Sequence, residues 1–225
     1  MPVALIVGAG SGLSASLGRL LKKEGFDIAV ASRTGGKFLK ENFLELKCDA
    51  TNPGQVEEAF KAVEAKWGVP DLVIFNAGYR TRGPFAELKA EEVKKTLESS
   101  AYGGFLVAQA AAKRMLQRGS GAIFFTGASA SVKGYAQSAP FAMAKFALRG
   151  LAQSMARELH PKNIHIAHFV IDGGIQQGND ARAADRGEDG MLLPDEIAKS
   201  YLAVYRQHRS AWSWELELRP WVEKF

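Results

Sequence analysis

A glycine-rich segment near the N-terminus carries the clearest signal of chemistry. It reads Gly8-Ala9-Gly10-Ser11-Gly12-Leu13-Ser14 and directly follows an apolar run, residues 3–7, that is typical of a strand. Glycines at a strand-to-helix turn let backbone N–H groups approach a pyrophosphate at the helix N-terminus. The spacing gives G-x-G-x-x-G only with Leu13 in the last place, and G-x-x-x-G-x-G only with Ser14 there. A glycine turn without a ligand stays open as the alternative.

The end of the second predicted strand, residues 27–31, carries Ser32 and Arg33. NAD-binding proteins commonly place an acidic residue here on the adenosine ribose, whereas NADP-binding proteins place a basic residue on the 2′-phosphate. No acidic residue lies between Ile28 and Lys40. Arg33, with Lys37 behind it, therefore favours NADP(H) over NAD(H), against the alternative of an ordinary solvated loop arginine.

The third predicted strand, residues 43–48, ends at Cys48 and is followed by Asp49 and Ala50. The Asp49 carboxylate at this position could lie beside an adenine amino group. Cys48 is interpreted as a small buried apolar residue, because no partner base is visible for a nucleophile. As the only cysteine it forms no internal disulfide, which fits a reducing compartment.

The elements that would position these residues alternate along the chain, as in βαβ units of a parallel sheet. The strands are mostly continuous apolar runs, as expected where both faces are covered. We expect strands at 3–7, 27–31, 43–48, 72–75, 122–126 and 164–171 and helices at 13–23, 55–67, 90–118, 142–159 and 195–208. Residues 214–219 alternate apolar and charged types and predict a short edge strand with one wet face.

Connections between these elements are short, so one domain over residues 1–225 is expected. Residues 176–190 are mostly polar and contain scattered glycines, which favours a mobile loop on the substrate side. Residues 212–225 form the predicted edge strand and tail.

Composition supports an ordinary globular protein of 225 residues, with 47% apolar and 24% charged residues. Disordered, collagen-like and disulfide-scaffold classes are thereby excluded. The net charge of +5 invites a nucleic-acid interpretation, but basic residues occur at most in pairs and alternate with acids, so a mildly basic surface is favoured. No apolar run approaches a membrane span, and a cytoplasmic location is expected.

The order of four signatures resembles the short-chain dehydrogenase/reductase family from about Pro2 to Ile175. The signatures are VGAGSGLS at 7–14, SR at 32–33, CDAT at 48–51 and FNAG at 75–78. The resemblance implies an α/β fold with a doubly wound, mostly parallel seven-stranded Rossmann sheet, helices on both faces and a nicotinamide cofactor. The implied cofactor-binding residues are Gly8, Gly10, Ser11, Gly12, Leu13, Ser32, Arg33, Asp49, Ala50, Asn76, Ala77, Gly78, Lys145 and Ile175.

The chain departs from this family at the catalytic positions. The family places a tyrosine and a lysine four residues apart, and here the pair reads Phe141 and Lys145. The serine expected thirteen residues before the tyrosine is Ala128, and the position that usually carries asparagine is Ser100. Only Lys145 is retained, as in a divergent branch of the family with phenylalanine for tyrosine.

These changes remove the groups that serve the alkoxide formed during carbonyl reduction. In the family the tyrosine donates the proton and the serine polarises the same oxygen, which Phe141 and Ala128 cannot do. Lys145 keeps its second role, a hydrogen bond to the nicotinamide ribose. The sequence thus predicts an NADP(H)-binding oxidoreductase of the carbonyl/alcohol class with a degenerate catalytic set, or alternatively a non-catalytic NADP(H)-binding sensor or assembly subunit.

Other polar residues offer weaker possibilities. Tyr135 could replace the missing donor, as could the hydroxyls of Ser129, Ser131 and Ser138; surface and loop-capping roles are the alternative. Tyr79, Arg80 and Arg82 follow the FNAG turn and could recognise an acidic substrate, although solvated arginines are favoured. His165 and His168 are three apart on a strand, so they point to opposite faces and a shared metal is disfavoured.

Two features favour a homo-dimer or homo-tetramer. Residues 106–115 are alanine-rich and would let another helix approach closely, and the family commonly pairs this helix and the next across a dimer interface. The tail concentrates the aromatic residues Trp212, Trp214, Trp221 and Phe225. The alternative is that these rings close the core at the edge of the sheet.

Overall fold

The computed structural model describes residues 1–36, 38, 41–178 and 180–223. The predicted support from Lys37 and the predicted interface role of Phe225 lie outside the described residues.

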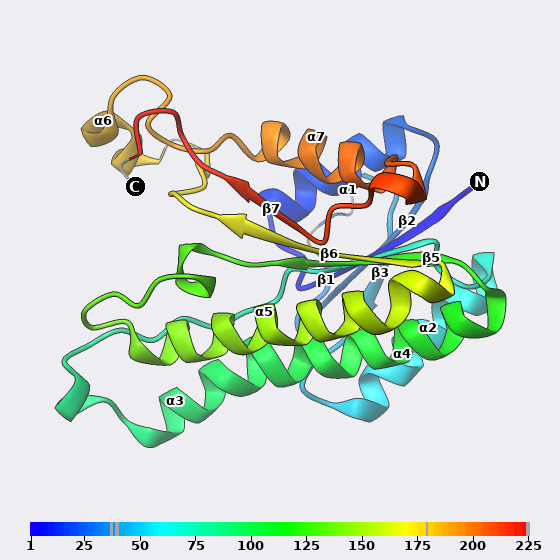
Figure 1. Cartoon of the computed structure of the whole chain (residues 1–225), viewed down its shortest axis with the longest axis horizontal. Coiled ribbons are helices and arrows are strands. Elements are labelled where there is room, and N and C mark those ends of the chain that lie inside the picture. The colour runs from blue at the N-terminus through cyan, green and yellow to red at the C-terminus, as the bar shows by residue number, and fades with distance from the viewer. Residues whose placement is uncertain (37, 39–40, 179, 224–225) are drawn as a thin grey trace.

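The sheet has seven strands, all parallel, in the order β3-β2-β1-β4-β5-β6-β7 (Figure 1). The predicted doubly wound sheet is confirmed, and each expected strand agrees with the observed one to within one residue at either end. The strands are β1 (Val3–Val7), β2 (Asp27–Ser32), β3 (Leu44–Lys47), β4 (Leu72–Phe75), β5 (Gly121–Thr126), β6 (Ile164–Ile171) and β7 (Glu215–Leu218). The apolar runs of β1, β4 and β6 are buried throughout, because helices cover both faces.

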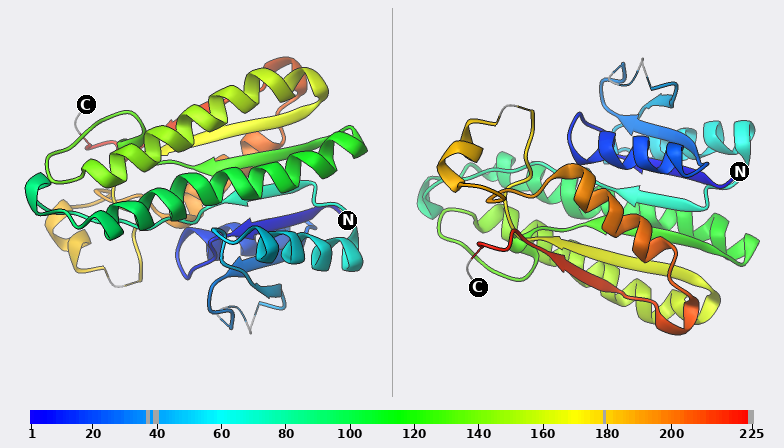
Figure 2. Two further views of the ribbon diagram at one scale, coloured as in Figure 1. Left: turned by 90° about the horizontal axis from the view of Figure 1, so that it is seen from below. Right: turned by 90° about the horizontal axis from the view of Figure 1, so that it is seen from above.

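Helices cover the two faces unequally (Figures 1 and 2). One face packs against α2 (Pro53–Trp67), α4 (Gly103–Arg118) and α5 (Ala139–Leu159), with Leu5 and Phe125 in its core. The other packs against α1 (Leu13–Lys23) and α7 (Pro194–Tyr205), with Ile6 and Phe124 in its core. Within the described part of the chain, no helix combines the length and the apolar character that a membrane crossing requires.

The expectation of one regular helix over 90–118 is wrong in one respect. A π-helical turn, Glu98–Tyr102, separates α3 (Ala90–Leu97) from α4. A π turn holds an extra residue relative to an α turn and often occurs at functional sites. It contains the buried residue Ser100, and the helical pattern of the sequence gives no sign of the change in winding.

Two further expectations need correction. The predicted loop 176–190 contains a short helix, α6 (Ala181–Arg186), whose N-cap Asp180 accepts a hydrogen bond from the Arg182 N–H. The edge strand β7 is confirmed, but its charged face is only partly exposed to solvent. Glu215 is bound by Arg149 of α5, and its side chain is only 20% exposed.

Candidate functional site

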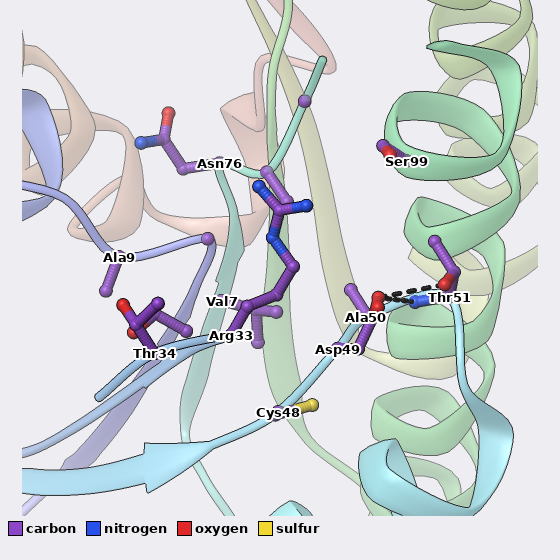
Figure 3. A pocket seen from close by; sticks show the side chains of 14 residues that line it. Val7, Ala9, Arg33, Thr34, Cys48, Asp49, Ala50, Thr51, Asn76 and Ser99 are labelled. Carbon is purple, nitrogen blue, oxygen red and sulfur yellow. Dashed lines mark hydrogen bonds between the residues drawn. The ribbon is translucent and has the colours of Figure 1, made fainter. Parts of the chain in front are cut away.

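A cleft of about 240 Å³ opens at the carboxyl ends of β1 to β4. The chain moves outward from β1 to β2 and β3 and then returns to β4 on the other side of β1. Such a reversal of strand order is where open α/β sheets bind ligands. The cleft is lined by Val7, Gly8, Ala9, Ser32, Arg33, Thr34, Cys48, Asp49, Ala50, Thr51, Asn76, Ala77, Gly78 and Ser99 (Figure 3).

The first turn of this cleft depends on Gly8. Its φ of +88° belongs to the region that favours glycine, and a Cβ on it would lie 2.2 Å from the backbone nitrogen of Ala77. The turn after β1 therefore comes into direct backbone contact with the turn after β4. Any side chain at position 8 would force the two turns apart.

Asn76 links the turns after β1 and β4 to α1 through hydrogen bonds. Its side-chain amide donates to Ser14 Oγ at 2.8 Å, and the Ser14 hydroxyl donates to the Gly8 carbonyl at 3.3 Å. The Asn76 N–H donates to the Val7 carbonyl at 2.8 Å. Ser14, which departs from the expected glycine spacing, thus has a structural role inside the turn.

The N-terminus of α1 is suited to an anion. Among the described residues, no side chain caps this helix at its N-cap residue, Gly12. The first N–H groups of a helix carry partial positive charge and lack partners within the helix. Gly10 has open space where a Cβ would lie, and the Gln177 side chain comes within 3.6 Å of the corresponding point on Gly12. The segment after β6 therefore lies against the glycine turn.

Arg33 extends into the cleft between Ala9 on one side and Ala50 and Ser99 on the other (Figure 3). Ser32, beside it, accepts a hydrogen bond from the Gly35 N–H at 3.1 Å, which fixes the bend after β2. The guanidinium thus lies within the same cleft as the glycine turn.

Asp49 also lines the cleft. Its carboxylate accepts hydrogen bonds from Thr51 N–H at 2.9 Å and from Thr51 Oγ1 at 2.8 Å (Figure 3). Cys48 is buried, and burial followed by the charges of Asp49 and Glu58 raises the pKa of its thiol to about 11. Its environment agrees with the predicted inert role.

Three residues at the catalytic positions implied by the resemblance, Ser100, Phe141 and Lys145, lie close together beside the cleft. Lys145 is buried, donates from Nζ to the Thr126 carbonyl at 2.7 Å, and lies 5.8 Å from the centre of the Phe141 ring. Burial lowers the pKa of Lys145 to about 8, which leaves its ammonium form predominant at pH 7. Ser100 Oγ and Lys145 Nζ lie 3.3 and 4.0 Å from the point that a Cβ on Gly78 would occupy.

Ser131, one of the predicted substitute hydroxyls, is fully buried in a polar chain. Its Oγ accepts the Ala128 N–H at 3.1 Å and lies 3.2 Å from His168 Nε2. His168 Nδ1 lies 3.1 Å from Glu215, which Arg149 also binds. Burial lowers the pKa of His168 to about 4, so this imidazole is neutral at pH 7. Ser131 consequently supports the backbone at Ala128 and is not exposed to a substrate.

The other candidate side chains fall in different environments. Tyr135 is 45% exposed, and Ser138 is buried with no partner for its hydroxyl among the described residues. His165 stacks on Trp212 with ring centres 4.6 Å apart, on the face opposite His168. Six residues line the cleft without having been predicted to bind the cofactor, and each lies next to a predicted position: Val7, Ala9, Thr34, Cys48, Thr51 and Ser99. The predicted cofactor-binding residues that do not line this cleft are Gly10, Ser11, Gly12, Leu13, Lys145 and Ile175.

Comparison with known proteins gives concordant matches. The family model for short chain dehydrogenases matches residues 2–183. The 3-oxoacyl-[acyl-carrier-protein] reductase MabA of Mycobacterium bovis is 28% identical over 188 residues, covering 84% of this chain and 75% of the relative. A short-chain dehydrogenase structure from Rhodopseudomonas palustris is 33% identical with a TM-score of 0.83, covering 98% of this chain and 99% of that one. An alcohol dehydrogenase structure from the archaeon Thermococcus sibiricus, complexed with 5-hydroxy-NADP, is 22% identical with a TM-score of 0.86, covering 100% and 98%.

Proposed function

Because the chain belongs to the short-chain dehydrogenase/reductase family of oxidoreductases, we propose that it binds NADP(H) in the cleft above β1 to β4 and acts slowly on carbonyl or alcohol substrates. The observation that carries the proposal is the presence of the Gly8 turn and the Arg33 guanidinium in one cleft. The Thermococcus sibiricus neighbour, complexed with an NADP derivative, supports the choice of cofactor.

Each residue has a defined part in cofactor binding under this proposal. The turn from Gly10 through Ser11 and Gly12 to Leu13 offers helix N–H groups to the pyrophosphate. Arg33, beside Ser32, pairs with the 2′-phosphate, while Asp49 and Ala50 flank the adenine. Lys145 binds the nicotinamide ribose, with Asn76, Ala77, Gly78 and Ile175 shaping the surrounding wall.

Turnover is expected to be slow because proton delivery lacks its usual group. NADPH, when bound, would supply the hydride for a carbonyl carbon, and the carbonyl oxygen would need a proton. Phe141 and Ala128 have no hydroxyl, and general acid–base assistance is typically worth about 10²- to 10⁴-fold in rate. Lys145, one helical turn after Phe141, keeps its ammonium group for the cofactor.

A second function is favoured by the contrast between the cofactor cleft and the catalytic positions. The cleft retains its glycine turn and its basic residue, whereas two hydroxyls are lost from the catalytic positions. A protein that binds NADP(H) without turnover, as a sensor or a subunit of an assembly, would have this combination.

Replacing Arg33 with alanine is expected to lower NADPH affinity about 10- to 100-fold and leave NADH affinity nearly unchanged. A charge-assisted hydrogen bond to a phosphate is worth about 1.5–3 kcal/mol, and NADH has no phosphate at this position. Calorimetric titration with both cofactors measures the effect, and Arg33→Lys is the control that keeps the charge. Equal affinities of the wild type for NADPH and NADH would contradict the proposed preference.

We also propose a homo-oligomer assembled through α4 and α5, which lie side by side on one face of the sheet (Figure 2). Phe105 and Phe146 are 41% and 45% exposed there. Two aromatic rings of the tail pack within the chain instead: Trp214 contacts the core and Arg149, and Trp212 stacks on His165. Trp221 remains 81% exposed.

Introducing charge on that helix face, as Phe105→Glu with Phe146→Glu, is expected to convert the assembly into monomers, because burying two carboxylates without partners is unfavourable. Light scattering measures the mass, with a deletion of residues 220–225 as the comparison for the tail. An unchanged mass in the double variant, together with dissociation by the deletion, would place the interface at the tail instead.

A further inference from the structure

Residues 79–81, in the segment after β4, point their side chains alternately to two sides. The Tyr79 hydroxyl donates to Glu92 of α3 at 2.6 Å, and the Thr81 hydroxyl donates to the same carboxylate at 3.3 Å. Arg80, between them, instead lies over the Phe141 ring of α5, with its guanidinium carbon 4.9 Å from the ring centre. One carboxylate on α3 thus directs the intervening arginine toward the catalytic positions.

The backbone of this segment is held at both ends. The Tyr79 N–H donates to Ser100 Oγ at 3.3 Å, and the Gly83 N–H donates to the Gln137 carbonyl at 3.1 Å. Ser100 therefore uses its hydroxyl to anchor the segment that carries Arg80. A segment fixed in this way can hold a guanidinium in place before a ligand arrives, which lowers the entropic cost of binding.

Positive charge gathers around Arg80, which feels the charges of Arg82 and Arg182. Among the described residues, neither Arg80 nor Arg82 has a carboxylate partner, whereas Arg182 is paired with Asp180 at 2.8 Å from its Nε. Partial loss of hydration, followed by repulsion from Arg82 and Arg182, lowers the pKa of Arg80. Like charges held together in this way favour the approach of an anion.

We propose that Arg80 and Arg82 bind an oxyanion carried by the substrate, so that the reactive carbonyl compound is an acid bearing a carboxylate or a phosphate group. This inference rests on the proposed oxidoreductase function and names its substrate class. Arginine presents a fork of N–H donors that matches either oxyanion, and it keeps its proton, so it orients the substrate and does not replace the missing proton donor. Placed over Phe141, the anion would bring the adjoining carbonyl group to the catalytic positions.

The test is calorimetric titration of the wild type, with and without saturating NADP⁺, using pyruvate, dihydroxyacetone phosphate and methyl pyruvate. At least one of the two anions is expected to bind at least tenfold more tightly than methyl pyruvate, which is uncharged; the tighter anion identifies the acidic group. Arg80→Met should remove that advantage while keeping an apolar contact with Phe141. Arg209→Met, at an exposed arginine in the 3₁₀ turn Arg209–Ala211, is the matched control and should change nothing.

Equal binding of all three compounds by the wild type, or an unchanged anion affinity in Arg80→Met, would overturn the inference. A parallel NADPH titration separates this result from the proposed function. Failure of NADPH to bind would overturn the function, while the anion titrations without cofactor would still decide the anion site.

Discussion

Replacing Phe141 with tyrosine and Ala128 with serine is expected to raise NADPH-dependent reduction of an activated ketone by about 10²- to 10⁴-fold over wild type. A phenol at position 141 would lie one helical turn from Lys145, whose ammonium stabilises the phenolate and lowers the phenol pKa. A serine at position 128 would add a hydroxyl dipole for the developing alkoxide. The rate is measured by loss of NADPH absorbance at saturating cofactor.

The single variants and a lysine variant make this result specific. Phe141→Tyr alone should give most of the gain, and Lys145→Met in the double variant should abolish it. Tyr135→Phe is the matched control, because Tyr135 is a solvent-exposed phenol six residues from Phe141. If the wild type already reduces dicarbonyls at ordinary rates and Tyr135→Phe loses that activity, Tyr135 is the donor and the proposed deficiency is refuted.

Replacing Gly8 with alanine is expected to lower NADPH affinity at least about 100-fold and to destabilise the fold by at least about 3 kcal/mol. The added methyl group would meet the Ala77 backbone 2.2 Å away, and the φ of +88° is unfavourable for alanine. Separation of the two turns would displace Asn76 from Ser14 and open the glycine turn. Chemical unfolding and NADPH titration measure the two losses.

Gly10→Ala is the control within the same motif, because the structure has open space around its Cβ position. This variant should keep the wild-type stability. If Gly8→Ala and Gly10→Ala unfolded at the same denaturant concentration, the contact between the turns after β1 and β4 would not matter for the fold.

Strand positions could be predicted closely because burial on both faces leaves continuous apolar runs such as Ile164–Ile171. The π turn at Ser100 could not, since its residues are equally compatible with an α-helix. What distinguishes this turn is a tertiary contact, the hydrogen bond between Ser100 and the Tyr79 backbone, which no local pattern records.

In the candidate site, too, some residues could be predicted from the sequence and others could not. The residues of the glycine turn are contiguous in sequence, so their shared position was predictable from spacing. Arg80 is exposed, as the sequence indicates, but its position over Phe141 could not be predicted, because Glu92 of α3 holds the residues on either side of it. Glu215 was likewise expected to face water, and its burial depends on Arg149 and His168, which lie far away in the sequence.

A crystal structure with NADP⁺ bound would show directly whether the cleft above β1 to β4 is the cofactor site. We expect the pyrophosphate at the N-terminus of α1, the 2′-phosphate within hydrogen-bond distance of Arg33 and the nicotinamide ribose on Lys145. We also expect no side-chain hydroxyl within about 3 Å of a carbonyl oxygen placed at the nicotinamide. A cleft that stays empty at saturating NADP⁺, or a Tyr135 hydroxyl within that distance, would contradict these expectations.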